Sequence, residues 1–389
     1  MKSTDDATFV AYMRSSLGEA AAGKFFDALR TEASVSIRLN PSKLLVSPFG
    51  GTPVPWSPYA YLLEKRPSFT MDPFFHAGCY YVQDSSAMFV GEVMRKLIAS
   101  ESGFLRVLDL CAAPGGKTTD IAASLRLARG NDFKLVANEL MRQRCSVLNE
   151  NVAVWGDRNV SVTNCDPKAF AGLGEYFDII LADVPCSGEG MMRKDAQAVA
   201  DWSAETVALC AARQRRIVAD VWQALKPGGV LVYSTCTFEH AENDGNLEWI
   251  CRELGASFID FDSAFEGPVK TAHGHLLVPG FVPGEGQWVG AVRKNGSGSD
   301  SKRLKKDEAI QRLRPLDTPF TDDSHAHFDL DRLQALHYLH GDSLALPDAP
   351  KGMLVMCYQG YPLGLAKNIG TRCNNLYPKS RRILKQIEI

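Results

Sequence analysis

A short apolar run followed by a glycine turn, within RVLDLCAAPGGKTTD at 106–120, constrains the fold of this chain more than any other segment. The run at 107–110 predicts a buried strand, and the residues from Thr118 onward predict a helix. A strand, a tight turn and a helix in this order form the first unit of a doubly wound sheet. Gly115 and Gly116 lack the Cβ atoms that would block the turn, so its backbone N–H groups and the helix N-terminus can bind a small polar ligand.

Two common nucleotide-binding motifs resemble this turn, and neither fits it. A phosphate-binding P-loop also ends in Gly-Lys-Thr, but it begins with glycine where this chain has Cys111. The G-x-G-x-x-G pattern of dinucleotide-binding turns is missing. A nucleoside triphosphatase and a nicotinamide-dependent enzyme are therefore disfavoured, and an ordinary connection without a ligand is the remaining alternative.

A carboxylate after the next strand favours a bound ligand. The segment 134–137 predicts a strand that ends at Asn138 and Glu139, about twenty residues beyond the glycines. A carboxylate in this position can accept hydrogen bonds from both hydroxyls of a ribose. The pattern suits an adenosyl compound without requiring a pyrophosphate, and we expect S-adenosylmethionine as the cofactor.

The rest of the central region alternates predicted helices with predicted strands. The apolar run FDIILA at 177–182 is typical of a parallel strand covered on both faces. Further strands are predicted at 160–163, 230–236, 258–261 and 288–292. We therefore expect an α/β fold with a doubly wound, mostly parallel, seven-stranded sheet.

Smaller regions flank this sheet at both ends of the chain. Near the N-terminus, apolar residues at helical spacing predict two helices separated by Gly18, and alternation at 35–39 predicts a strand. Near the C-terminus, a helix is predicted at 328–340 and a hairpin with its turn at 359–360. The expected division is a small N-terminal α/β domain at 1–75, a core at 76–293, a Gly/Ser and Lys/Arg linker at 294–306, and a small C-terminal α+β domain at 307–389.

Composition and charge limit the compartment and the partners. The 389 residues are 45% hydrophobic and 23% charged, and the formal net charge of −2 means that a polyanion must be bound by local basic patches. Neither a signal peptide nor a long apolar run is present, so we expect a cytoplasmic protein that binds no membrane. The ten cysteines form no C-x-x-C pair and the eight histidines lack metal-site spacing, so reduced thiols and no metal are expected. A monomer is expected.

Two cysteines follow two of the predicted parallel strands. Loops at the carboxyl ends of neighbouring parallel strands open into one cleft, so Cys186 and Cys236 should meet beside the cofactor. The alternative is that both are small buried hydrophobic residues, the commoner role of a single free cysteine. A thiolate in the cleft could add to C6 of a cytosine and make C5 nucleophilic enough to accept a methyl group.

Two charged residues suit this chemistry. A thiolate needs a positive or hydrogen-bonding environment, and Lys117 in the opposite turn is one source. Asp183 could hydrogen-bond the N3 and N4 edge of the base once that edge is protonated. Both therefore join the candidate catalytic residues.

Four motifs in register resemble those of one family. CAAPGGKT at 111–118, DVPCSGEG at 183–190 and STCT at 234–237 are similar to the cofactor motif and the two cysteine motifs of RNA cytosine-C5 methyltransferases of the Sun/Fmu type. The segment FTMDPFFHAGCYYVQDSSAMF at 69–89 resembles the region before the core in the ribosomal small subunit methyltransferase F branch. One departure is GEGQWVGAVRK at 284–294, where relatives more often have paired aromatic residues.

The resemblance implies a role for each site residue. It makes Cys236 the nucleophile and Cys186 the residue that assists product release, and it places Asp183 between cofactor and base. It puts Asp166 near the adenine. The implied cofactor-binding residues are Cys111, Ala112, Ala113, Pro114, Gly115, Gly116, Lys117, Glu139, Asp166 and Asp183.

The resemblance also implies an RNA substrate and RNA-binding end domains, the C-terminal one PUA-like. We expect methylation of C5 of an unpaired cytosine in 16S-type ribosomal RNA or the small ribosomal subunit. Transfer RNA is the alternative substrate, and an RNA-binding assembly factor without turnover is the alternative class. The end of the chain at 367–385 holds six Lys or Arg residues and no acid, which favours phosphate contacts.

Overall fold

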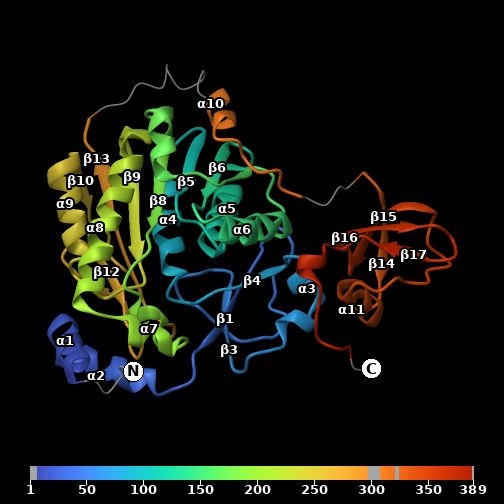
Figure 1. The fold of residues 1–389 in the computed structure, drawn as a ribbon, viewed down its shortest axis with the longest axis horizontal. Coiled ribbons are helices and arrows are strands. Elements are labelled where there is room, and N and C mark those ends of the chain that lie inside the picture. Colours follow the sequence, from blue (N-terminus) through green and yellow to red (C-terminus); the bar gives the residue numbers. More distant parts are fainter. Residues whose placement is uncertain (1–6, 297–306, 320–323, 388–389) are drawn as a thin grey trace.

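The computed structural model of the protein describes residues 7–296, 307–319 and 324–387. The expected linker at 294–306 lies outside the described residues from position 297 onward. A large central sheet with helices on both faces stands beside two smaller four-stranded sheets, one from each end of the chain (Figure 1).

The central sheet is the predicted doubly wound sheet, extended by a hairpin. Its strand order is β11-β12-β13-β9-β8-β5-β6-β7, and β10 pairs with β13. The parallel strands are β5 (Leu105–Asp109), β6 (Phe133–Asn138), β7 (Val160–Thr163), β8 (Phe177–Asp183) and β9 (Leu225–Thr235). The antiparallel strands are β10 (Ala256–Ile259), β11 (Val269–Lys270), β12 (Gly274–Leu277) and β13 (Gln287–Lys294). The expected seven strands did not include the β11–β12 hairpin, which makes the sheet nine-stranded.

Alternate residues of the parallel strands point into two cores. Val107 and Ile179 belong to the hydrophobic cluster on the side of α4, α5 and α6, whereas Leu108 and Ile180 belong to the cluster on the side of α8 and α9. This explains why these strands are apolar at nearly every position. The helices are α4 (Phe89–Ser100), α5 (Gly116–Arg129), α6 (Arg142–Trp155), α7 (Ala196–Asp201), α8 (Ala204–Val221), α9 (Asp244–Leu254) and α10 (Asp307–Arg312). No helix in the described part of the chain is long and apolar enough to cross a membrane.

The N-terminal region contains the predicted helices and strand. Gly18, at a φ of 79°, separates α1 (Ala7–Leu17) from α2 (Glu19–Leu29). The small sheet has the order β2-β3-β1-β4, built from β1 (Val35–Leu39), β2 (Thr52–Pro53), β3 (Ala60–Leu63) and β4 (Tyr80–Val82). A buried hydrogen bond from Arg38 Nη2 to Thr119 Oγ1, at 2.7 Å, attaches this sheet to α5 of the core.

From residue 324 to 387, the C-terminal domain combines a mixed sheet with helix α11 (Arg332–His340), as predicted for a PUA-like domain. Its strands are β14 (Ala326–Leu330), β15 (Gly352–Tyr358), β16 (Tyr361–Asn368) and β17 (Cys373–Asn375). The prediction of a helix beginning at 328 is wrong, because the first residues belong to β14 and Asp331 starts the helix through a capping box with Gln334. The hairpin turn at Gln359 and Gly360 is where the sequence predicts it, with φ values of 49° and 80°.

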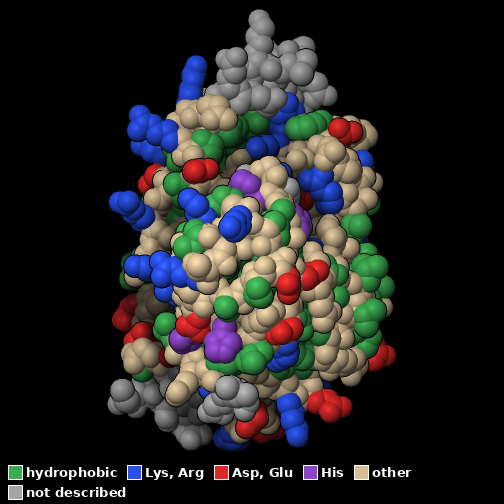
Figure 2. Space-filling view, turned by 90° about the vertical axis from the view of Figure 1, so that its right-hand side faces the viewer, with side chains coloured by type: hydrophobic (Ala, Val, Ile, Leu, Met, Phe, Trp, Pro, Cys, Tyr) green, Lys and Arg blue, Asp and Glu red, His purple; other side chains and the backbone are tan. Residues whose placement is uncertain are grey.

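The two ends of the chain pack on each other. Ile37 and Tyr80 of the N-terminal sheet share one hydrophobic cluster with Leu336 of α11. The short helix α3 (Pro73–His76) contacts α11 and β16, and His76 Nδ1 lies 3.0 Å from the hydroxyl of Tyr377. When the molecule is viewed from the side of the C-terminal domain, Lys and Arg side chains gather along one edge (Figure 2).

Candidate active site

The two cysteines lie together at the carboxyl edge of the central sheet. Strands β8 and β9 pair in parallel with Asp183 opposite Ser234, so the loops that follow them leave the sheet side by side. Cys186 Sγ and Cys236 Sγ are 3.3 Å apart. Both are free thiols and both are partly exposed. The fold therefore brings Cys186 and Cys236, fifty positions apart in the sequence, into one site.

The two thiols differ in their electrostatic environment. The hydrogen bond with Cys236, and then burial, raise the pKa of Cys186 well above its ordinary value. Cys186 therefore keeps its proton near neutral pH, and either thiol can donate across the 3.3 Å contact between them. Cys186 is therefore a poor candidate for the thiolate that the chemistry needs.

Lys117 and Asp183 form an ion pair at this site. Lys117 Nζ lies 2.8 Å from Asp183 Oδ2, and Ser234 Oγ donates to Asp183 Oδ1 at 2.8 Å. Burial lowers the pKa of Lys117, but Asp183 and to a smaller extent Cys236 raise it by more, and the net pKa is raised. The ammonium group of Lys117 therefore stays charged, and it is close enough to Cys236 for the two side chains to interact electrostatically.

The turn at 111–117 is held in place from outside the central sheet. Gly115 has a φ of 111°, in the left-handed region that favours glycine, at the N-cap of α5. The carbonyl of Pro114 accepts hydrogen bonds from Tyr81 Oη of β4 at 3.1 Å and from Asn151 Nδ2 of α6 at 2.8 Å. The N-terminal sheet and α6 therefore both position the turn.

Glu139 has an oxygen that fits a ribose. Glu139 is 4% exposed, and its Oε1 accepts from the backbone N–H of Met141 at 2.9 Å. Its buried Oε2 has no hydrogen-bond donor within the described ranges, although Arg144 Nη1 lies 3.2 Å away. Since a buried carboxylate oxygen is costly without a donor, ribose hydroxyls would complete its environment. The residues present fit an adenosyl cofactor.

Asp166 and Asp109 lie at the same edge of the sheet. Asp166 follows β7, is exposed, and accepts from the backbone N–H of Lys168 at 2.9 Å, so its present contact is with its own loop. Asp109, which was not predicted to be a site residue, ends β5 beneath the turn and accepts from Thr118 Oγ1 at 2.6 Å. Burial raises the pKa of Asp109 to about 7. The sequence did contain a signal for Asp109, because it is a carboxylate within an apolar run directly before the glycine turn.

A buried carboxylate cluster, also missed from the sequence, lies behind the cysteines. Its members are Glu189, Glu239 and Glu242, each no more than 4% exposed. Ser187 Oγ, next to Cys186, lies within hydrogen-bond distance of Glu189 and Glu242. Ser187 Oγ is also 3.0 Å from Thr237 Oγ1, the hydroxyl beside Cys236. The cluster therefore ties the two cysteine loops to each other.

Burial disfavours the ionised form of these three carboxylates and raises their pKa values. It raises the pKa of Glu242 to about 7, against hydrogen bonds that lower it, from Ser187 and Gln214 among others. Burial also raises the pKa of Glu189, and burial with the charge of Glu189 raises that of Glu239. The only sequence signal was a glutamate shortly after each cysteine, which on its own is unremarkable.

The segment that departs from relatives lines the cysteine loops. Gly190 N–H donates to the carbonyl of Cys236 at 2.8 Å, and a Cβ on Gly190 would lie 2.8 Å from that oxygen and 3.1 Å from the carbonyl of Gly286. Glu285 pairs with Arg193 at 2.6 Å, and its N–H donates to Asp84. The loop before β13 thus closes one side of the site.

Comparisons with known proteins match all three regions of the chain. The family model described as 16S rRNA methyltransferase RsmB/F matches residues 97–271. The N-terminal domain of 16S rRNA methyltransferase RsmF matches residues 6–85, and the methyltransferase RsmF PUA domain matches residues 325–383.

Curated relatives named Ribosomal RNA small subunit methyltransferase F agree with these matches. The protein of Enterobacter sp. (strain 638) is 31% identical over 461 aligned positions, covering 95% of this chain and 94% of the relative. The chain belongs to the ribosomal RNA small subunit methyltransferase F family. With the Pectobacterium atrosepticum protein, identity rises to 37% over 296 residues, 70% of this chain but only 59% of the relative's length.

Solved structures show the same fold as this F-family chain. A methyltransferase homolog from Pyrococcus horikoshii has a TM-score of 0.62 and 25% identity, over 75% of this chain and 96% of that protein. NSun6 from the same organism, solved with SFG, has a TM-score of 0.61 and 19% identity, over 74% and 98%. Methyltransferases of the RsmB/F family use S-adenosylmethionine, in agreement with the predicted cofactor.

Proposed function

We propose that the protein transfers a methyl group from S-adenosylmethionine to C5 of a cytosine in 16S ribosomal RNA, through a covalent adduct between Cys236 and C6 of the base. The observation that carries this proposal is the approach of Cys186 Sγ and Cys236 Sγ to 3.3 Å at the carboxyl edge of β8 and β9. Two thiols side by side in this position suit addition and release at one pyrimidine ring.

Cys236 begins the reaction by forming a bond from its sulfur to C6 of the cytosine. The electron pair of the C5–C6 double bond becomes available at C5, which is too weakly nucleophilic without this step. The charged ammonium of Lys117 favours the thiolate form of Cys236 before the addition. S-adenosylmethionine supplies the methyl group as an electrophile, and Glu139 with the turn at 111–117 would hold it.

Asp183 orients the base, and Cys186 ends the reaction. Asp183 contacts Lys117 of the cofactor turn and Ser234, two residues before Cys236. From there its carboxylate would accept a hydrogen bond from the N3 and N4 edge of the protonated ring. After methyl transfer the C5 proton passes to water, its bonding pair restores the C5–C6 double bond, and Cys236 leaves C6 as a thiolate. Cys186 Sγ lies 3.3 Å from the departing sulfur, which supports a role in this release.

Two alternative functions differ in substrate and in chemistry. Transfer RNA is the alternative substrate, whereas the curated relatives are named for ribosomal RNA. An assembly factor that binds RNA without turnover is the alternative class. The pairing of Lys117 with Asp183 beside two free thiols disfavours it, because binding alone requires none of these contacts.

Bisulfite sequencing of total RNA from cells with and without the gene tests the proposal. A 16S cytosine that resists conversion only when the gene is present is the expected result. The purified protein with S-adenosylmethionine and 16S transcript should restore the same mark. A lost mark in transfer RNA would identify the alternative substrate, and an unchanged RNA profile would overturn the proposed reaction.

A further inference from the structure

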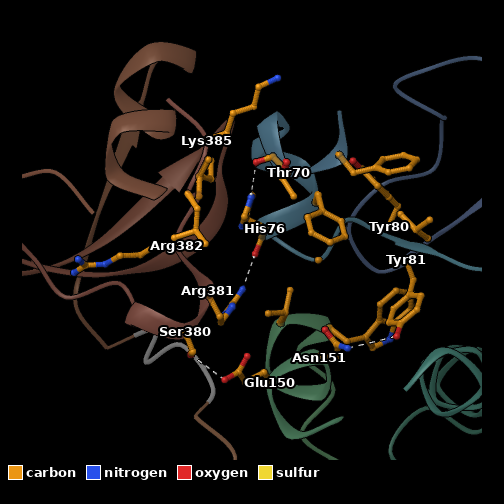
Figure 3. Close-up of a pocket in the computed structure, with 18 of the residues that line it drawn as sticks. Thr70, His76, Tyr80, Tyr81, Glu150, Asn151, Ser380, Arg381, Arg382 and Lys385 are labelled. Carbon is orange, nitrogen blue, oxygen red and sulfur yellow. Dashed lines mark hydrogen bonds between the residues drawn. The ribbon is translucent and has the colours of Figure 1, made fainter. Parts of the chain in front are cut away.

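A second cavity lies away from the cysteines, where three parts of the chain meet (Figure 3). We call it the junction pocket. It is lined by residues of the short 3-10 helix η1 (Phe69–Met71), of α3 and of β4 in the N-terminal region, by the second half of α6, and by the tail at 380–385. Its volume is about 640 Å³, within the range of small-molecule and nucleotide sites. Neither cysteine of the active site lines it.

The lining of the junction pocket is positively charged. Its cations are Arg66, Arg381, Arg382 and Lys385. Arg382 turns toward the C-terminal domain, where its guanidinium carbon would meet a Cβ on Gly341 (Figure 3). The remaining cations of the lining are Arg66, Arg381 and Lys385. Glu150 is the carboxylate in this lining, and it already accepts from Ser380 Oγ at 3.0 Å.

His76 adds no charge to this pocket. Its ring nitrogens lie 3.0 Å from Tyr377 Oη and 2.9 Å from the carbonyl of Thr70. Burial lowers the pKa of His76 to about 4, so the ring is neutral near pH 7. The excess of positive charge therefore comes from arginine and lysine side chains at the mouth, which favours a phosphate-bearing ligand.

Aromatic rings form much of the wall. Tyr80 is buried and donates its hydroxyl to Asp72 at 2.7 Å, and one face of Trp155 is covered by Arg38 at 4.9 Å. Phe75 and Tyr81 are partly exposed, so their rings are the ones that a ligand can reach. Aromatic surface combined with cations at the mouth is the pattern that binds unstacked bases together with their phosphates.

The junction pocket is joined to the cofactor turn. Two of its lining residues, Tyr81 and Asn151, donate hydrogen bonds to the carbonyl of Pro114 at 3.1 and 2.8 Å. A ligand in the pocket would therefore contact the same side chains that position the turn. An RNA strand bound here would run next to the catalytic site while remaining outside it.

We propose that the junction pocket binds an unstacked nucleotide of the RNA substrate other than the target cytosine. The base lies against Phe75 and Tyr81, and the adjoining phosphates lie against Arg66, Arg381 and Lys385. Because this nucleotide contacts the N-terminal region, α6 and the C-terminal tail together, the pocket sets the position of the RNA relative to the catalytic cleft. This inference rests on the proposed function in taking RNA as the ligand.

Charge reversal at the mouth tests the phosphate contacts. Arg66 and Lys385 are exposed, and the double variant Arg66→Glu, Lys385→Glu changes them without touching a catalytic residue. We expect its affinity for full-length 16S transcript in filter binding to fall by at least about tenfold near 0.1 M salt, and the slope of log K against log salt to fall by about two. The matched control, Arg213→Glu with Arg216→Glu on exposed positions of α8, should lose less than about threefold.

Filling the pocket tests the base contact separately. Thr70 is exposed at the rim, and Thr70→Trp should weaken RNA binding while leaving the salt slope unchanged, because no charge is altered. Melting temperatures equal to that of the wild type would establish that the variants fold, and Arg66→Ser with Lys385→Ser is the milder substitute if charge reversal destabilises them.

The outcomes separate this inference from the proposed reaction. If the charge-reversal and the filled variants both bind 16S transcript as tightly as the wild type does, the pocket does not contribute to RNA binding, even if the wild-type protein methylates the RNA. Tight binding of cytidine monophosphate alone, with unchanged RNA affinity in the variants, would assign the pocket to a free nucleotide and overturn the inference. A wild-type protein that binds 16S transcript through the pocket without methylating it would instead count against the reaction.

Discussion

At the scale of single residues, the roles proposed for the two thiols can be tested one at a time. Cys236→Ala removes the sulfur that lies 3.3 Å from Cys186 Sγ, and with it the proposed nucleophile. We expect methyl transfer to RNA to fall by at least about a thousandfold. Affinity for S-adenosylmethionine, measured by calorimetry, should change little because Cys236 lies outside the turn at 111–117. Substantial residual methylation would require a different nucleophile.

Cys186→Ala should separate release from attack. Addition by Cys236 survives in this variant, whereas the thiol that assists its departure is missing. A protein–RNA adduct that resists denaturation should therefore accumulate and appear as a shifted band on a denaturing gel. The double variant with Cys236→Ala is the control and should form none. Rapid turnover by Cys186→Ala without adduct would contradict the role given to this residue.

Glu242 should make the folded protein less stable as pH rises, whereas the carboxylate of a surface ion pair makes it more stable as pH rises. Its folded pKa is raised by burial from 4.5 to about 7, so the folded state holds a proton that the unfolded chain has lost between these values. The free energy of unfolding therefore falls as pH rises from about 4.5 to 7, by roughly 3 kcal/mol at most from this group.

Urea unfolding at pH 5 and pH 8 measures this dependence. Glu242→Gln has no proton to lose, so the drop between the two pH values should shrink in this variant. Glu205→Gln on the exposed surface of α8 is the control and should behave as the wild type does. An equal drop in all three proteins would show that Glu242 is not protonated in the folded state.

At the scale of elements, the loop after β8 depends on close contact with the end of β9. A Cβ on Gly190 would lie 2.8 Å from the carbonyl of Cys236, so Gly190→Ala must push the two cysteine loops apart. We expect a cost of about 1–3 kcal/mol in stability and a larger relative loss of methyl transfer. Gly172→Ala is the matched control, because a Cβ there meets nothing within 4 Å. Thermal unfolding and methylation assays of both variants measure the difference.

The elements that sequence predicted well are those with a local signal. Apolar runs marked β5 and β8, and parallel pairing then required Cys186 and Cys236 to leave the sheet at one edge. The carboxylate cluster could not be predicted, because Glu189 and Glu242 meet only after β8 and β9 have paired. The start of α11 was misplaced because Phe328 continues a helical pattern that in the fold belongs to a strand.

At the scale of the whole molecule, the ends of the chain are part of one structure. Tyr377 and Ile383 are buried, and Ile383 N–H donates to the carbonyl of Leu339. Deleting the residues from 367 onward would therefore expose a core shared with the N-terminal sheet, and lost RNA binding would not report on charge. Substitutions of exposed cations are the sharper experiment.

A formal net charge of −2 leaves RNA affinity to such local cations. Lys367, Arg372 and Lys379 are exposed basic residues of the C-terminal domain outside the junction pocket. If they contact phosphates, replacing all three by serine should lower the slope of log K against log salt by up to about three and weaken every RNA alike. Filter binding of 16S transcript and of an unrelated RNA across salt concentrations measures both effects. Phosphate contacts carry no sequence information. A variant that lost affinity for the 16S transcript but kept affinity for the unrelated RNA would therefore show that these residues recognise RNA shape or sequence. An unchanged slope would show that these basic residues do not contact phosphates.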